Sequence, residues 1–139
     1  MERNYQIIRF LQYLQNEDIR VTDDFVKDLR KLILTDIDTF TSQFYKDFTR
    51  KNFKNYNRFE ILKLTKQQKN ELGNNILWRY EYRNTSNFRC IFTIAKDENN
   101  IDFPLLLCAF NENGKKKSGA DSYSHNIKRA IQILKKISC

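Results

Sequence analysis

Three apolar and aromatic segments follow one another in the second half of the chain, and they constrain the fold more than any other feature. They are residues 76–82, 88–95 and 103–110, and the polar stretches 84–87 and 96–100 separate them. Aromatic and β-branched residues are typical of strands, and short polar connections join antiparallel neighbours. The order of these segments predicts an antiparallel β-meander.

Segments with other periodicities lie before and after the meander. Thr22 and Thr35, each followed by aspartate, predict the starts of two helices that form a hairpin. Residues 18–22 predict a short strand, and residues 59–65 predict a short strand or an extended connection. Apolar residues at helical spacing predict further helices over 2–16 and 123–137, and the polar segment 66–75 ends in a turn signal.

These elements predict one α+β domain over residues 1–139, in which a small antiparallel β-sheet is packed by an N-terminal helical hairpin and a C-terminal helix. Residues 1–17 are predicted to add an extra N-terminal helix. A chain of 139 residues, 40% hydrophobic with three Gly and one Pro, suits a single packed core. No apolar run approaches the roughly 20 residues of a membrane span, and no signal-peptide pattern is evident, so we expect no membrane association and a cytoplasmic location.

The net charge is +8, and most of the excess lies in two segments. Residues 40–72 carry eight basic and three acidic side chains, and residues 111–139 carry seven basic and two acidic ones. If the fold brings these segments together, they form a surface that can bind phosphate, and the alternative is that basic helices are simply solvated. In the first segment aromatic residues alternate with cations, which could form a face that stacks on nucleic-acid bases, but Phe40, Phe44 and Phe48 have the helical spacing that favours a core role.

Ordinary catalytic motifs are absent from the sequence. The cysteines Cys90, Cys108 and Cys139 lack zinc-site spacing, and their odd number favours a reducing compartment. His125 is the only histidine, and there is no P-loop, dinucleotide fingerprint or metalloprotease motif. We therefore expect no metal and no cofactor.

Arginine, lysine and tyrosine side chains can still cleave RNA. The 2′-hydroxyl lies beside its own phosphate, so the attack is intramolecular and needs neither a bound water nor a metal. A protein has to orient the backbone, stabilise charge on phosphorus and move protons. Arginine suits the charge role because its planar fork matches two phosphate oxygens.

The order of strand, helical hairpin, meander, basic loop and final helix resembles the RelE/ParE superfamily of toxins from type II toxin–antitoxin systems, in particular its RelE/HigB-like members. The resemblance covers about residues 18–137 and leaves residues 1–17 as an extension to a RelE-like core. Its motifs are short, so their order carries most of the weight. They lie in Ile19–Leu32, Leu77–Arg83, Phe88–Phe92, Leu105–Phe110, Lys115–Lys117 and Tyr123–Ala130.

This resemblance implies a toxin that acts as a metal-independent endoribonuclease, an mRNA interferase that inhibits translation on the ribosome. The implied partners are mRNA, the ribosome and a cognate antitoxin protein. Other members of the superfamily inhibit gyrase without a nuclease site, so a non-enzymatic binder of gyrase or another host factor is the alternative. A plain RNA-binding protein of mobile-element origin is a third hypothesis.

The resemblance also implies roles for particular residues. Arg89 and Lys117 would stabilise the charge of the transition state, and Tyr123 with His125 would transfer protons. The alternatives are a surface charge for Arg89, a packing role for Tyr123 and a solvated side chain for His125. The residues implied or proposed to contact RNA are Arg79, Arg83, Lys115, Lys116, Lys51, Lys54 and Arg58. The sequence departs from the family at Tyr80 and Tyr82, where several nucleases carry lysine, and in the ending of the lysine motif.

Overall fold

In the computed structural model, which describes residues 2–31, 37–48, 59–82, 87–112 and 122–137, five helices pack around a five-stranded β-sheet. The elements in chain order are α1 (Glu2–Asn16), β1 (Arg20–Val21), α2 (Asp23–Lys31), α3 (Ile37–Phe48), β2 (Phe59–Ile61), α4 (Lys66–Leu72), β3 (Trp78–Tyr82), β4 (Phe88–Lys96), β5 (Asp102–Asn111) and α5 (Ser122–Ile137). The predicted α+β class is confirmed.

The sheet is mixed rather than wholly antiparallel, which corrects the prediction from the sequence. Its strand order is β1-β5-β4-β3-β2. Strands β2 to β5 pair antiparallel in succession, whereas β1 runs parallel to β5, with Arg20 opposite Leu105. A two-residue strand carries no sequence signal for its partner, because its pairing is set by long-range packing.

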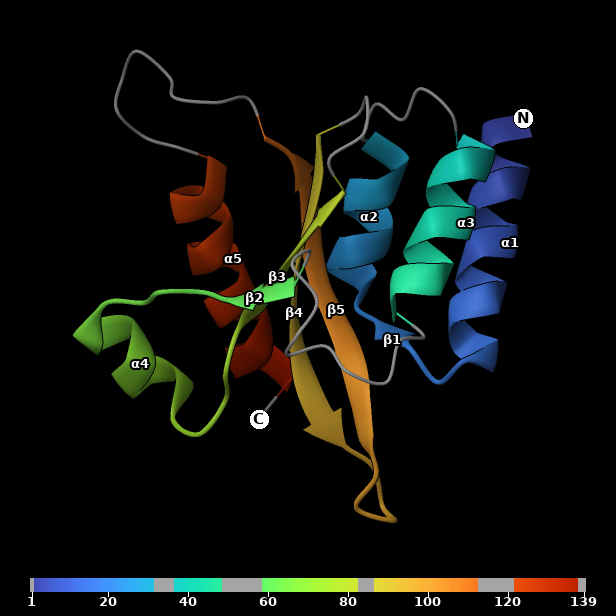
Figure 1. Cartoon of the computed structure of the whole chain (residues 1–139). Helices are drawn as coiled ribbons and strands as arrows, with labels where there is room; N and C mark the ends of the chain where they lie inside the picture. The colour runs from blue at the N-terminus through green and yellow to red at the C-terminus, as the bar shows by residue number, and fades with distance from the viewer. Residues whose placement is uncertain (1, 32–36, 49–58, 83–86, 113–121, 138–139) are drawn as a thin grey trace.

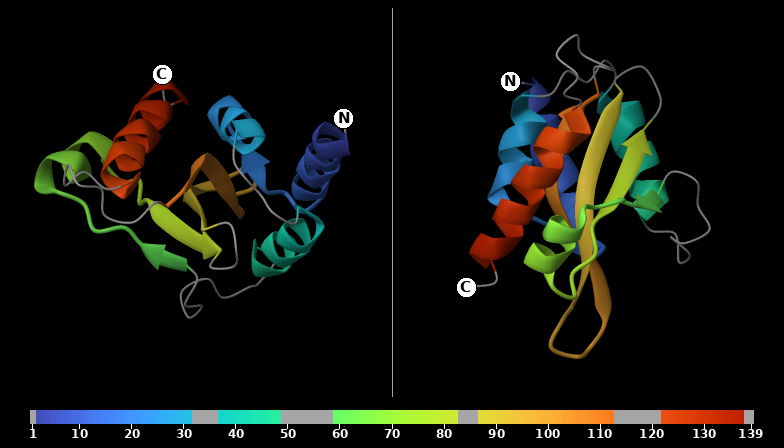
Figure 2. Two further views of the ribbon diagram at one scale, coloured as in Figure 1. Left: turned by 90° about the horizontal axis from the view of Figure 1, so that it is seen from above. Right: turned by 90° about the vertical axis from the view of Figure 1, so that its left-hand side faces the viewer.

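Helices cover both faces of the sheet. Helices α1, α2 and α3 lie on one side, and α4 and α5 lie on the other, as the views in Figure 1 and Figure 2 agree. Each layer buries its own apolar cluster against the sheet, because alternate strand residues point to opposite faces. No helix in the described ranges is long and apolar enough to cross a bilayer.

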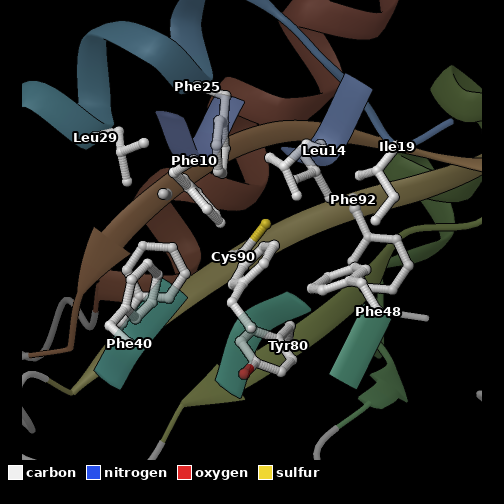
Figure 3. Packing of buried hydrophobic residues seen from close by; sticks show 14 of the residues in the cluster. Phe10, Leu14, Ile19, Phe25, Leu29, Phe40, Phe48, Tyr80, Cys90 and Phe92 are labelled. Carbon is white, nitrogen blue, oxygen red and sulfur yellow. The ribbon is translucent and has the colours of Figure 1, made fainter. Parts of the chain in front are cut away.

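The larger cluster is rich in aromatic rings. Phe40, Phe44 and Phe48 are all buried, which confirms the core role that their spacing predicts. Figure 3 shows Tyr80, Cys90 and Phe92 among the side chains of this cluster. Ring pairs such as Phe44 and Tyr80, with centroids 5.1 Å apart, meet edge to face, the geometry that aromatic quadrupoles favour.

Helix α4 is the one helix of the described chain that the sequence reading missed. Residues 66–72 are almost wholly polar, so hydrophobic periodicity gave no signal. A capping box starts the helix, because Thr65 accepts a hydrogen bond from the Gln68 backbone while the Gln68 side chain accepts one from the Thr65 backbone. Gly73, at φ 63°, ends it.

Side chains complete the edge of β5 beyond the short strand β1. The Thr22 hydroxyl donates to the carbonyl oxygen of Leu107 at 2.7 Å, and Asp28 Oδ2 accepts the backbone N–H of Ala109 at 3.0 Å. Asp28 also binds Arg129 of α5 at 2.9 Å. This carboxylate therefore joins both helical layers to the sheet.

Replacing Asp28 by Asn should lower the free energy of unfolding by about 2 kcal/mol, because Arg129 loses its anion in a site where Asp28 is only 13% exposed. Chemical denaturation measures the change. Glu98→Gln removes the same charge from an exposed turn, so it serves as the matched control and should change stability by less than about 0.5 kcal/mol. Equal stability of both variants would contradict the role given to Asp28.

Candidate functional site

Charged side chains gather on the α5 side of the sheet, where β3 and β4 run next to each other. Strand alternation places Arg79 and Glu81 on this face and sends Tyr80, between them, to the opposite one. Glu81 lies directly opposite Arg89 in the register of β3 and β4. The sheet therefore brings two arginines and a glutamate together in a small area.

Ion pairs connect these groups across the sheet into a set that we call the arginine–glutamate network. Arg79 pairs with Glu60 at 2.6 Å and also with Glu81. Arg89 Nε lies 3.9 Å from Glu81 and donates to Glu112 at 2.7 Å. Arg89 Nη1 also donates to the carbonyl oxygen of Phe88 at 3.0 Å. The five charged side chains come from β2, β3, β4 and the residue that follows β5.

The centre of the network is buried. Arg89 and Glu81 are each only 7% exposed, whereas the Glu60 side chain is 56% exposed and that of Glu112 is 33% exposed. A buried ion pair is seldom more stabilising than well-packed apolar residues of the same volume. Since stability alone does not explain why charged residues are buried here, and since Tyr123 lies on the same face, the arginine–glutamate network is the best candidate for a functional site.

Tyr123, in the first turn of α5, lies beside this network. Its ring meets Phe110 edge to face at 5.0 Å, and Arg79 Cζ lies 6.0 Å from the ring centroid. Burial raises the pKa of Tyr123 to about 12, and the positive charges of Arg79 and Arg89 offset only part of that rise. The phenol is therefore protonated at neutral pH and available as a donor.

The hydroxyl of Tyr123 has no hydrogen-bond partner within the described residues, although the atom is buried. Burying a hydroxyl without a partner costs about 1–3 kcal/mol. A buried hydroxyl without a partner requires a physical explanation, and one explanation is that the Tyr123 hydroxyl donates to a bound ligand.

The remaining predicted site residues fall into two groups. His125 is exposed, and because two helical positions are separated by about 200°, it points away from the sheet that Tyr123 faces. The structure therefore does not bring His125 to the network. Lys117, Arg83, Lys115, Lys116, Lys51, Lys54 and Arg58 lie outside the described residues.

Sequence reasoning missed the three glutamates of the network. Glu81 lies two residues after Arg79, so alternation alone places both on one face of a strand. Glu60 and Glu112 gave no such signal, because their positions depend on the pairing of β2 with β3 and on where β5 ends. Within the described ranges, no three His, Cys, Asp or Glu side chains converge as a metal site would require.

The chain matches no protein-family model, no curated protein and no solved structure. The chain is an α+β domain with helices on both faces of a mixed five-stranded sheet (Figure 1). Its candidate site is the arginine–glutamate network together with Tyr123.

Proposed function

We propose that this protein is a toxin of the RelE/ParE type and acts as a metal-independent endoribonuclease on mRNA. The observation that carries the proposal is the convergence of Arg79, Arg89 and Tyr123, three side chains from three different elements, at one place on the sheet. In the transfer of an RNA phosphodiester to its own 2′-oxygen, two guanidinium groups can stabilise the charge on phosphorus and a protonated phenol can supply a proton. The order of elements along the chain supports the same class.

Arg89 would hold the scissile phosphate. In the resting structure Glu112 occupies its Nε donor, so a phosphate oxygen has to replace the Glu112 carboxylate there. The exchange is feasible because Glu112 follows the last residue of β5 and its side chain is one-third exposed. The phosphate is negatively charged like the Glu112 carboxylate, so Arg89 still has an anionic partner after the exchange.

Tyr123 would supply the proton for the leaving group. Attack of the 2′-oxygen on phosphorus forms a cyclic phosphate and breaks the bond from phosphorus to the 5′-oxygen. The 5′-oxygen leaves with a developing negative charge, and the phenol of Tyr123, which is protonated at neutral pH, can donate to it. The products are a 2′,3′-cyclic phosphate and a 5′-hydroxyl end.

Two macromolecular partners follow from this proposal. The ribosome would present the mRNA, and a cognate antitoxin would cover the arginines and so block the access of phosphate. An antitoxin segment with acidic side chains suits the net charge of +8. A cytoplasmic location would be consistent with both partners.

Replacing Glu112 by Gln should tighten RNA binding by about threefold to tenfold, because the amide competes less well than a carboxylate for Arg89 and repels phosphate less. Fluorescence anisotropy with a labelled, uncleavable 2′-deoxy oligonucleotide measures the affinity. Asp102→Asn removes a carboxylate at the other end of β5, where Asp102 pairs with Lys96, and should leave binding nearly unchanged. A weaker affinity for Glu112→Gln would count against the exchange.

Controlled expression with mapping of mRNA 5′ ends on translating ribosomes tests the function itself. We expect new 5′-hydroxyl ends inside coding regions within minutes of induction, together with growth arrest. Intact transcripts in arrested cells would contradict the ribonuclease and favour a non-enzymatic inhibitor of gyrase or another host factor.

A further inference from the structure

Cleavage by the proposed route needs a group that accepts the proton of the 2′-hydroxyl, and neither predicted proton-transfer residue suits that task. Tyr123 is protonated at neutral pH, because the ordinary pKa of a phenol is about 10 and burial raises it further, so it cannot take up the proton of the 2′-hydroxyl. His125 is exposed, and helical geometry turns it away from the face that Tyr123 covers. The acceptor therefore has to come from the network itself.

We propose that Glu81 is the catalytic proton acceptor, a role that rests on the ribonuclease function proposed above. Its carboxylate contacts both arginines, being paired with Arg79 and lying 3.9 Å from Arg89 Nε. A phosphate bound by the same guanidinium groups comes to lie next to this carboxylate. The 2′-hydroxyl, on the carbon beside the 3′-phosphate, is then within its reach.

The other two carboxylates are less suitable. Among the described residues Glu60 pairs with Arg79 and not with Arg89, and more than half of its side chain is exposed to solvent. Glu112 has to leave Arg89 before a phosphate can bind there. Glu81 contacts both cations, is 10% exposed as a side chain, and stands on the central part of the sheet, where its position is fixed by pairing with β4.

The reaction balances without a further reactant. Glu81 takes the proton of the 2′-hydroxyl as the new bond from the 2′-oxygen to phosphorus forms. The bond from phosphorus to the 5′-oxygen breaks, and the 5′-oxygen receives the Tyr123 proton. One carboxylate ends protonated and one phenol ends deprotonated, and exchange with solvent water restores both.

The test compares Glu81→Gln with the wild-type protein in single-turnover cleavage of a short RNA from pH 4 to pH 9. The amide keeps the shape of the side chain but cannot accept the proton, so the rate at pH 7 should fall by about 10²- to 10⁴-fold. We expect the wild-type rate to fall toward acid pH as Glu81 becomes protonated, and this fall should be absent from Glu81→Gln. Affinity for the 2′-deoxy oligonucleotide should not weaken, because a negative charge has been removed. Glu71→Gln, which breaks the surface pair with Lys135, is the control and should cleave at the wild-type rate.

Two further outcomes separate the role of Glu81 from the function itself. If the wild-type protein cleaves RNA and Glu81→Gln cleaves equally fast with the same pH profile, the assignment of Glu81 is wrong while the ribonuclease stands. If the wild-type protein leaves the RNA intact on ribosomes as well, both are wrong. Should Glu81→Gln fail to fold, Glu81→Asp keeps the charge but withdraws it by one methylene, and a folded Glu81→Asp with an unchanged rate would overturn the proposal.

Discussion

Replacing Arg89 by Ala should reduce RNA cleavage by about 10³-fold. Arg89 is held in place by the backbone of β4, by Glu112 and by its own contact with the Phe88 carbonyl oxygen, so its donors are oriented before substrate arrives. Preorganised donors of this kind stabilise the charge that develops on phosphorus, and alanine offers none.

Two control variants separate this loss from a folding defect. Arg30→Ala removes an exposed arginine from the last turn of α2 and should cleave at the wild-type rate. Arg89→Lys keeps the charge but loses the planar fork, so it should recover only a small part of the activity. Product formation is followed by gel electrophoresis, and circular dichroism shows whether each variant is folded. A folded Arg89→Ala protein with wild-type cleavage would contradict the proposed role.

Replacing Tyr80 by Phe should lower the free energy of unfolding by about 2 kcal/mol, although it removes a single oxygen atom. Tyr80 is fully buried and donates to Asp47 Oδ2 at 2.5 Å, and Asp47 is fully buried as well. Gln43 supplies another hydrogen bond to the same carboxylate, at 2.9 Å. Without the phenol, the buried carboxyl group of Asp47 lies in an aromatic core with one donor fewer.

Tyr13→Phe is the matched control for this second substitution. Tyr13 is 47% exposed, and its hydroxyl accepts a hydrogen bond from Arg9 on the surface of α1. Its loss should cost less than about 0.5 kcal/mol. Urea denaturation of the two variants measures the difference, and similar stabilities would show that Asp47 finds a substitute donor.

The secondary structure could be predicted from the sequence wherever its pattern is local. Amphipathic spacing in residues 2–16 and 122–137 produces helices that bury one face, and the aromatic runs form β3, β4 and β5. Helix α4 was not predicted from the sequence, because its stability depends on a capping box rather than on an apolar stripe. The parallel pairing of β1 with β5 was not predicted, because a two-residue strand contains no local pattern that indicates a partner more than 80 positions away.

The candidate site could be predicted in part. Arg79, Arg89 and Tyr123 were identified from the sequence, and the structure brings them together. The glutamates of the network were not identified, because their positions beside the arginines depend on the register of strand pairing. The pairing of β3 with β4, for example, places Glu81 opposite Arg89. The resemblance pointed to Tyr80 as a position where several nucleases carry lysine. Strand alternation places the Tyr80 side chain on the opposite face of the sheet, where it is buried in the core. The residues on the site face are Arg79 and Glu81, which flank Tyr80 in the sequence.

The most direct test of the account is to observe the site while a nucleic acid binds. In NMR titrations with the uncleavable 2′-deoxy oligonucleotide, the Nε–H signals of Arg79 and Arg89 and the ring signals of Tyr123 should shift together and saturate with one dissociation constant. The Nε–H signal of Arg129, which is held by Asp28 at the edge of β5, should not move. Saturable binding that leaves Arg89 and Tyr123 unchanged would contradict the claim that these side chains meet at one phosphodiester.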